Sequence, residues 1–459
     1  MTYIPHTDAD RKAMLEAIGV DSLDDLFDAV PADLRFPELD LPPGLSEMET
    51  AWELNGLASA NVAANDFALF LGAGAYNHFI PSVVNHILLR GEFYTAYTPY
   101  QPELSQGTLQ AIFEYQSMMC ALTGMDVANA SHYDGATSLA EAVIVANAHF
   151  RGKRSKIILS PGVNPQYRAV VRTYHQGNDL KFVGDKGSAT VPDLVDMLDD
   201  DTAMLVVSYP NFFGQIDDLT GLAKSVHDAG ALLCMVVDPI ALGLFKSPGE
   251  LGADIVVGEG QPLGIPLSFG GPYLGFFATR EKFVRKIAGR IVGETVDADG
   301  RRAYVMTLRP REQDIRREKA TSNICTNQGL MALAACVYMS VMGKHGLRRA
   351  AELCYHKAHY AAQQIDALEG YSVDMSQPFF KEFVVACPEP VAAINDVLLE
   401  HWGIIGGYDL SKDYPARENQ MLLAVTEMNT KDEIDTLVEA LRSAPDDIAN
   451  HAHHHHHHS

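Results

Sequence analysis

The sequence predicts an α/β fold built around a large, mostly parallel sheet in residues 61–320. Uninterrupted apolar runs at residues 203–207 and 231–237 are typical of strands that helices cover on both faces. Helical segments at residues 165–177 and 219–228 alternate with these strands. This order predicts right-handed crossovers and places a functional site at the carboxyl ends of the strands.

Residues 1–60 are expected to form a helical arm that ends in a connector. Thr7 with Asp10, and Ser22 with Asp25, each place a hydroxyl cap three positions before an acidic residue. This spacing is typical of helix starts. The proline-rich stretch at residues 36–44 then favours an extended chain.

Residues 321–450 are expected to form a smaller α+β domain. A long helical stretch at residues 330–368 is followed by short strands at residues 382–385 and 422–425. Residues 451–459 contain a run of histidines, which we interpret as an affinity tag without functional meaning.

The composition excludes several classes of partner. The net charge of −24 argues against binding to nucleic acid, which requires clustered Lys and Arg. The N-terminus shows no basic stretch followed by an apolar run, so no secretory signal is expected. The apolar run at residues 330–342 is shorter than the ~20 residues that span a bilayer. The six cysteines form no C-x-x-C pair, so no metal site is expected. We therefore expect a cytoplasmic protein with no membrane contact.

Two segments could hold the two ends of a phosphorylated cofactor. The turn Asp134-Gly135-Ala136-Thr137 begins a strong helix and could present free N–H groups to a phosphate, although taken alone it also fits an ordinary helix cap. Asp238 ends a buried strand, where a carboxylate can pair with a pyridine nitrogen; a common turn residue is the alternative. Together these segments indicate a pyridoxal-phosphate site.

The aldehyde of that cofactor needs a primary amine, and none is found at the expected place. The strand after Asp238, at residues 253–258, runs on to Pro262, which stands where the lysine would be. The lysines that follow Asp238 most closely are Lys246, Lys282 and Lys286. Lys246 comes before the end of that strand, and the other two come after the next strand. We therefore expect a degenerate site that cannot hold the cofactor covalently.

Three loops concentrate polar and aromatic side chains. The first two carry Asn77 with His78, and Tyr97, Tyr100, Gln101 and Glu103 among prolines; the third ends in the turn Thr321-Ser322-Asn323. Such stiff polar loops suit a site wall and an interface equally well. Arginines at residues 309–317 could clamp a carboxylate or a phosphate, whereas a solvated domain hinge is the alternative.

Four strings in these segments are very similar to one family. They are FYTAYTPYQPE at residues 93–103, YDGAT at 133–137, GEGQPLG at 258–264 and KATSNICTNQ at 319–328. They resemble the first subunit of glycine dehydrogenase (decarboxylating), the two-chain bacterial form of the P-protein of the glycine cleavage system. The resemblance covers essentially the whole chain before the tag.

The resemblance implies a fold-type-I pyridoxal-phosphate architecture and an α2β2 complex. In the family, the second subunit holds pyridoxal phosphate on its lysine, and the first carries a degenerate copy of the site. The complex decarboxylates glycine and passes the aminomethyl group to the lipoyl arm of H-protein. The nine candidates for lining a shared site are Asn77, His78, Tyr97, Tyr100, Gln101, Glu103, Thr321, Ser322 and Asn323.

Two other functions stay open on the sequence. The chain could be a non-catalytic scaffold that stabilises the second subunit and docks H-protein. It could also be an independent pyridoxal-phosphate enzyme that uses an unexpected lysine. The density of polar side chains at residues 97–106 exceeds what a scaffold needs, which favours a chain that lines a shared site.

Overall fold

The computed structural model describes residues 5–455, and it describes side chains up to residue 450. The chain divides into two compact units, Met1–Val62 and Ala63–Ser459. The histidine run that we interpret as a tag lies outside the residues whose side chains are described.

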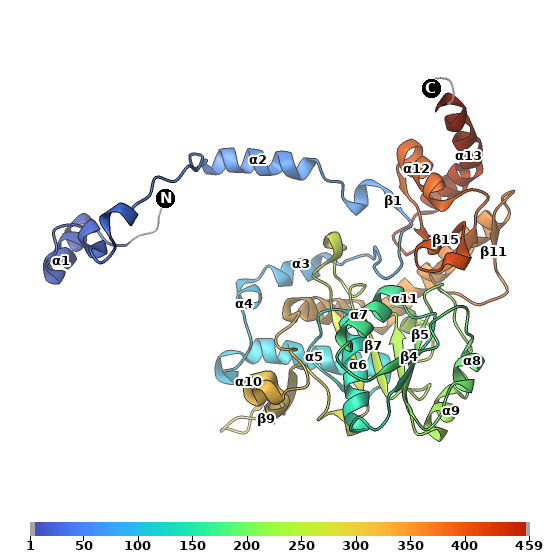
Figure 1. The fold of residues 1–459 in the computed structure, drawn as a ribbon, viewed down its shortest axis with the longest axis horizontal. Coiled ribbons are helices and arrows are strands. Elements are labelled where there is room, and N and C mark those ends of the chain that lie inside the picture. Colours follow the sequence, from blue (N-terminus) through green and yellow to red (C-terminus); the bar gives the residue numbers. More distant parts are fainter. Residues whose placement is uncertain (1–4, 456–459) are drawn as a thin grey trace. The chain divides into compact units, whose positions relative to one another are not determined.

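A seven-stranded sheet forms the centre of the second unit (Figure 1). Its strands are β2 (Val127–Ala128), β3 (Lys156–Leu159), β4 (Lys181–Val183), β5 (Thr202–Tyr209), β6 (Leu232–Val237), β7 (Ile255–Glu259) and β8 (Gly275–Thr279), in the order β2-β8-β7-β6-β5-β3-β4. The five strands from β7 to β4 are parallel, and β8 runs antiparallel to both of its neighbours. The predicted mostly parallel α/β sheet is confirmed.

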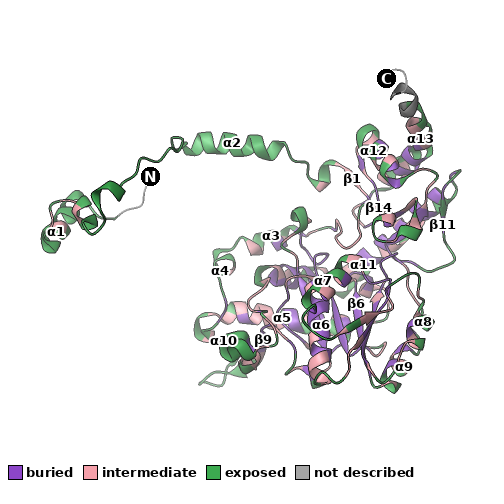
Figure 2. Cartoon of the chain, in the orientation of Figure 1, coloured by how far each residue is buried: buried purple, intermediate pink, exposed green. Residues whose placement is uncertain are grey.

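Helices cover both faces of this sheet, which explains the uninterrupted apolar runs. Leu205 and Val207 of β5 pack into one core, and Met204 and Val206 pack into the other. The covering helices include α5 (Gln106–Thr123), α6 (Gly135–His149), α7 (Pro165–Tyr174), α8 (Val191–Asp196) and α9 (Leu222–Asp228). Buried residues therefore concentrate along the strands (Figure 2).

The second unit also contains several shorter elements outside the large sheet. They are α3 (Ser82–Leu88), α4 (Gly91–Tyr94), α10 (Gln313–Arg316) and an antiparallel hairpin of β9 (Ile291–Val296) and β10 (Arg302–Thr307). The hairpin packs on α5, where Tyr304 and Met306 join Leu109 in a small core.

A second, smaller sheet lies in the C-terminal part. It contains β11 (Ser372–Val373), β12 (Glu382–Ala386), β15 (Gln420–Ala424) and β14 (Tyr408–Asp409), all antiparallel, with α12 (Val391–Trp402) and α13 (Lys431–His455). Their core also takes in Phe70. Just before it, β1 (Ala68–Leu69) pairs in parallel with β13 (Ile404–Ile405). Residues 68–70 therefore pack with the C-terminal sheet.

One helix, α11 (Gly329–Asp366), connects the two cores. It is broken at Gly343, where φ is 57° and ψ is −175°. Ala334 and Tyr338, before the break, pack with the large sheet, while Ala358 and Ile365, after it, pack with the small one. α11 is long and apolar enough to cross a membrane, but its buried residues belong to these two cores.

The N-terminal unit contains α1 (Asp8–Ile18) and α2 (Glu47–Ser59). The predicted cap of α1 is confirmed, because Thr7 Oγ1 accepts from the N–H of Asp10 at 3.2 Å. Ser22 Oγ accepts likewise from the N–H of Asp25 at 3.3 Å. No residue from 5 to 62 is buried, so this unit has no core of its own.

Candidate functional site

The predicted phosphate cup at the start of α6 is already filled by a carboxylate of the same chain. Glu259, the last residue of β7, accepts from the N–H of Gly135 through Oε2 at 3.0 Å. Its other oxygen accepts from the N–H groups of Gln261 at 3.0 Å and Leu274 at 2.9 Å. Burial raises the pKa of Glu259 to about 8, against the effect of these three donors.

Gly135 is required here because the helix start lies against other atoms. A Cβ at this position would lie 2.3 Å from the hydroxyl of Tyr167 and 2.9 Å from the backbone nitrogen of Glu259. Asp134 caps the helix, with its Oδ1 accepting from the N–H of Thr137 at 2.8 Å. Ala136 is buried in the first turn of α6. The ordinary helix cap and the predicted anion cup thus coincide, but the cup faces Glu259.

Asp238 is paired with a lysine that the sequence analysis did not consider. Lys381 Nζ lies 2.7 Å from Asp238 Oδ2, and the lysine side chain is only 2% exposed. The same Nζ lies 3.0 Å from Nε2 of His78 and 3.5 Å from the centre of the Tyr76 ring. Lys381 directly precedes β12, so it comes from the C-terminal sheet and is far in sequence from Asp238 and from the lysines that follow it.

The lysine fixes the state of the histidine beside it. An ammonium group can only donate, so Nε2 of His78 accepts and Nδ1 carries the proton. Nδ1 then donates to Glu427 Oε2 at 2.7 Å. Burial opposes ionisation of Glu427, but the hydrogen bonds from His78 Nδ1 and from the N–H of Phe79 outweigh it and hold the pKa of Glu427 below its usual value. Cys354 Sγ lies 3.3 Å from the same carboxylate oxygen. These atoms satisfy one another, and the adjacent ammonium group disfavours a metal cation here.

Pyridoxal phosphate does not fit this pocket. The cavity lined by Asp238, Pro262, Tyr167 and Glu259 has a volume of about 70 Å³. Small-molecule and cofactor sites commonly measure roughly 300 Å³ or more. Moreover, the carboxylate of Asp238 and the N–H of Gly135, which would hold the two ends of the cofactor, are engaged by Lys381 and Glu259.

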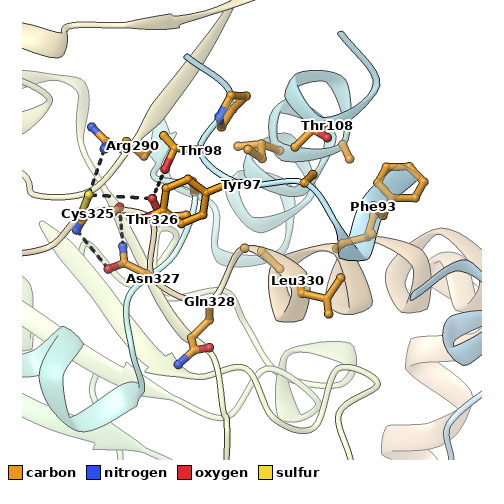
Figure 3. A pocket seen from close by; sticks show the side chains of 18 of the residues that line it. Phe93, Tyr97, Thr98, Thr108, Arg290, Cys325, Thr326, Asn327, Gln328 and Leu330 are labelled. Carbon is orange, nitrogen blue, oxygen red and sulfur yellow. Dashed lines mark hydrogen bonds between the residues drawn. The ribbon is translucent and has the colours of Figure 1, made fainter. Parts of the chain in front are cut away.

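A larger pocket of about 490 Å³ opens elsewhere in the second unit (Figure 3). Its walls come from residues 93–99 and from residues 325–330, which lead into α11. The hydroxyls of Thr98 and Thr326 are hydrogen-bonded to each other and join the two walls. The side chain of Tyr97 is 77% exposed, so its ring is free to meet a further chain or ligand.

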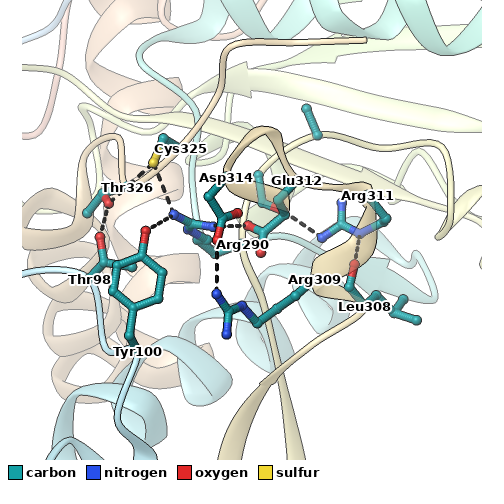
Figure 4. A network of polar contacts seen from close by, with 12 residues as sticks. Thr98, Tyr100, Arg290, Leu308, Arg309, Arg311, Glu312, Asp314, Cys325 and Thr326 are labelled. Atoms are coloured by element: carbon teal, nitrogen blue, oxygen red, sulfur yellow. Dashed lines mark hydrogen bonds and ion pairs between the residues drawn. The ribbon is translucent and has the colours of Figure 1, made fainter. Parts of the chain in front are cut away.

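Arg290 stands at the base of this pocket and connects it to a polar network (Figure 4). Its Nη1 lies 2.6 Å from Glu312 Oε1, and its Nη2 donates to the hydroxyl of Tyr100 at 2.9 Å and to Cys325 Sγ at 3.0 Å. The Tyr100 ring lies beneath the guanidinium groups of both Arg290 and Arg309. Nε of Arg290 is buried without a hydrogen-bond partner in the described part of the chain.

The nine predicted site residues do not gather in one place. Tyr97 lines the large pocket and Tyr100 its polar base, while Gln101 and Glu103 are exposed on the adjoining turn. Thr321 and Ser322 line a separate pocket of about 190 Å³ with several arginines, and Asn323 is exposed. Asn77 lines a third pocket, of about 270 Å³, and His78 belongs to the buried cluster around Lys381.

The position of Arg290 in the sequence does not reveal its contacts. The arginine stands just before β9, outside the run at residues 309–317 that we singled out. Only the fold brings it beside Tyr100 and Cys325, so local sequence gives no sign of its role. Size alone would not identify the pocket either, because another cavity of about 530 Å³ lies beside Arg168 and Arg417.

Comparisons with known proteins agree with one another over nearly the whole chain. A family model described as "Glycine cleavage system P-protein" matches residues 1–441. A Thermomicrobium roseum protein named "Probable glycine dehydrogenase (decarboxylating) subunit 1" is 56% identical over 97% of this chain and 100% of its own length. A Desulforamulus reducens protein of the same name is 53% identical over 96% of this chain and 99% of its own length.

Solved structures give the same result. The crystal structure of a glycine decarboxylase (P-protein) of the glycine cleavage system, in inhibitor-bound form, aligns with a TM-score of 0.87 and 42% identity, covering 97% of this chain and 100% of that chain. A sphingosine-1-phosphate lyase from Burkholderia pseudomallei aligns with a TM-score of 0.65 at 16% identity, covering 93% of this chain and 97% of that chain, and it supports the fold alone. The fold-type-I architecture of pyridoxal-phosphate enzymes is thereby confirmed.

Proposed function

Because the chain belongs to the P-protein family of the glycine cleavage system, we propose that it is the first subunit of glycine dehydrogenase (decarboxylating). In this function it pairs with a second subunit as an α2β2 complex in the cytoplasm. The complex releases carbon dioxide from glycine and transfers the remaining aminomethyl group to lipoylated H-protein. The chain by itself lacks a complete active site.

The observation that carries the proposal is the contrast between two pockets. The pocket that would hold a cofactor in this chain measures about 70 Å³ and its charged groups are engaged. The pocket behind Tyr97 measures about 490 Å³ and has an unpaired buried donor on Arg290. We therefore place the chain's contribution to catalysis at the second pocket.

Pyridoxal phosphate, held by a lysine of the second subunit, would supply the electron sink for loss of carbon dioxide. The residues of this chain have other tasks in the proposal. Arg290 offers a positive charge to a carboxylate, and Glu312 and Tyr100 hold its guanidinium plane in place. Apolar walls such as Phe93 and Leu333 exclude water, which strengthens these interactions. Tyr97, with its exposed ring, lies against the second subunit.

A glycine–bicarbonate exchange assay on the co-expressed two-chain complex with H-protein tests this proposal. Exchange should require both chains. Tyr97→Ala and Thr326→Val should lower the exchange rate at least about ten-fold, which corresponds to the loss of one good contact. Both variants should still assemble with the second subunit on gel filtration.

Tyr174→Ala is the matched control, because Tyr174 is also an exposed tyrosine but lies outside the pocket. If assembly persists and the pocket variants exchange like the control, the chain is a scaffold and a shared active site is ruled out.

A further inference from the structure

We propose that the vestigial cofactor pocket of this chain is permanently closed by two of its own side chains, with the Lys381 ammonium group and the Glu259 carboxyl group occupying the places of the two ends of a cofactor. Lys381 meets Asp238, and Glu259 meets the start of α6. The pocket has thus become a joint between the large sheet and the C-terminal sheet. This inference concerns the isolated chain and does not depend on the proposed function.

The ammonium group of Lys381 has a partner for each of its three N–H groups. Its three N–H groups meet the carboxylate of Asp238 at 2.7 Å, Nε2 of His78 at 3.0 Å and the face of Tyr76 at 3.5 Å. A lysine is rarely buried this completely unless it is paired. Asp238 follows β6 of the large sheet, and Lys381 directly precedes β12 of the C-terminal sheet. The loop that carries Tyr76 and His78 is hydrogen-bonded to both parts, through Gln261 on one side and Glu427 on the other.

Glu259 makes the corresponding contacts at the other end. Its Oε2 accepts from the N–H of Gly135 at the start of α6, the place where the N-terminus of a helix would otherwise bind an anion. Its second oxygen ties together the segments on either side of the β7–β8 connection through Gln261 and Leu274. Glu259 lines the same small cavity as Pro262 and Asp238. Lys381 does not line this cavity itself, but it contacts Asp238, which does.

The next residue in the chain strengthens the joint. Glu382 accepts from the N–H of Ala73 at 2.7 Å and from the hydroxyl of Tyr76 at 2.8 Å. The Tyr76 ring therefore lies over Lys381 while its hydroxyl is held by Glu382. The two consecutive residues Lys381 and Glu382 therefore hold both Asp238, the residue that would pair with the ring nitrogen of a cofactor, and the loop at residues 73–78.

This arrangement also decides against Lys381 as a substitute Schiff-base lysine. Its Nζ lies at the aspartate that would face the ring nitrogen, which is the opposite end of the ring from the aldehyde. An amine held as an ammonium ion by Asp238 is also a poor nucleophile, because the free base is the reactive form.

Thermal unfolding of the full-length chain tests the joint. Lys381→Ala should lower the unfolding midpoint by roughly 5 °C or more, because it leaves the largely buried carboxylate of Asp238, 14% exposed, without its ion-pair partner. Added methylammonium chloride should restore part of this loss by occupying the space of the missing ammonium group. Lys381→Met, whose side chain fills that space, should gain nothing from the same salt, and neither should the wild-type chain.

A double variant keeps the test decisive if Lys381→Ala does not fold. Asp238→Asn combined with Lys381→Met removes both charges, so it should unfold at a higher temperature than Lys381→Met alone. Equal midpoints for these two variants, or a Lys381→Ala chain as stable as the wild type, would overturn the joint.

Incubation with pyridoxal phosphate, borohydride reduction and peptide mass spectrometry test the closure itself. The wild-type chain should show no pyridoxyl group on Lys381, whereas exposed Lys344 reports reaction with any accessible amine. Stoichiometric labelling of Lys381 would overturn the proposal.

Discussion

Arg290 is the residue on which the proposed shared site depends most. Its guanidinium group contacts two carboxylates, those of Glu312 and Asp314, a tyrosine hydroxyl and a thiol, and each contact restricts its orientation. We expect Tyr100→Phe, which removes only the hydroxyl, to lower the exchange rate of the complex roughly ten-fold, since hydrogen bonds to charged groups contribute about 1.5–3 kcal/mol. Steady-state exchange kinetics at several glycine concentrations measure this, with Tyr174→Phe as the control. A Tyr100→Phe complex with unchanged kinetics would show that the network is only structural.

Glu141 predicts a pH dependence of stability. It is 2% exposed, and Ser322 Oγ donates to it at 2.6 Å. Burial raises its pKa from 4.5 to about 7. A raised carboxyl pKa stabilises the folded chain fully below the unfolded value, and this stabilisation is lost as the pH rises through the folded value, a loss of up to about 3 kcal/mol.

The unfolding midpoint of the chain should therefore fall as the pH rises from about 5 to about 8, that is, from the unfolded carboxyl pKa of 4.5 to the folded values. Glu259 and Glu382 act in the same direction, because burial raises their pKa values to about 8 and about 7. Glu141→Gln should reduce the fall without abolishing it, whereas Glu114→Gln, at an exposed position on α5, should leave it unchanged. Calorimetry at several pH values measures both, and parallel pH curves for Glu141→Gln and wild type would contradict the prediction.

At the scale of elements, α11 depends on one glycine. Gly343 has a backbone conformation, φ 57° and ψ −175°, that residues with a side chain rarely adopt, although a Cβ there would meet no atom within 4 Å. Gly343→Ala should thus cost about 1–3 kcal/mol of unfolding free energy through backbone strain alone. Urea denaturation measures this. Gly107→Ala, in the first turn of α5 and equally free of neighbours, should change it by less than about 0.5 kcal/mol.

The elements that the sequence predicted well are those that have the same apolar surroundings on both faces. The strands at residues 203–207 and 231–237 are apolar on both faces because helices cover both faces, so their type follows from local composition. The hairpin of β9 and β10 was not predicted, because its outer half is polar and exposed. The break at Gly343 also escaped prediction, since a single glycine is compatible with an unbroken helical pattern.

The residues of the candidate site also fall into two groups, those that local sequence identifies and those that it does not. Asp238, Pro262 and the turn at residues 134–137 could be identified because the order of strands and turns places them. Lys381 and Arg290 could not, because each meets its partners only after distant parts of the chain have folded together. A buried lysine beside Asp238 is therefore a property of the tertiary structure that no local motif announces.

For the whole molecule, the N-terminal unit predicts a change on assembly. Trp52 is 64% exposed, and Leu54 and Leu57 beside it are exposed as well, an apolar surface that is unusual for a chain without a partner. Adding the second subunit should shift the fluorescence of Trp52 to shorter wavelength and reduce its quenching by acrylamide. A Trp402→Phe background isolates this signal, because the sequence has only two tryptophans. Unchanged emission in an assembled complex would show that the arm stays in water.

The pairing of β1 with β13 limits how this protein can be dissected. β1 forms a separate two-stranded sheet with β13, and Phe70 packs in the core of the C-terminal sheet, so both come from residues that precede the entire large sheet in sequence. A fragment that starts after residue 320 would leave the edge of Ile404 open and a hole where the phenyl ring belongs. Anyone isolating that region would have to graft residues 63–72 onto it, for instance by circular permutation.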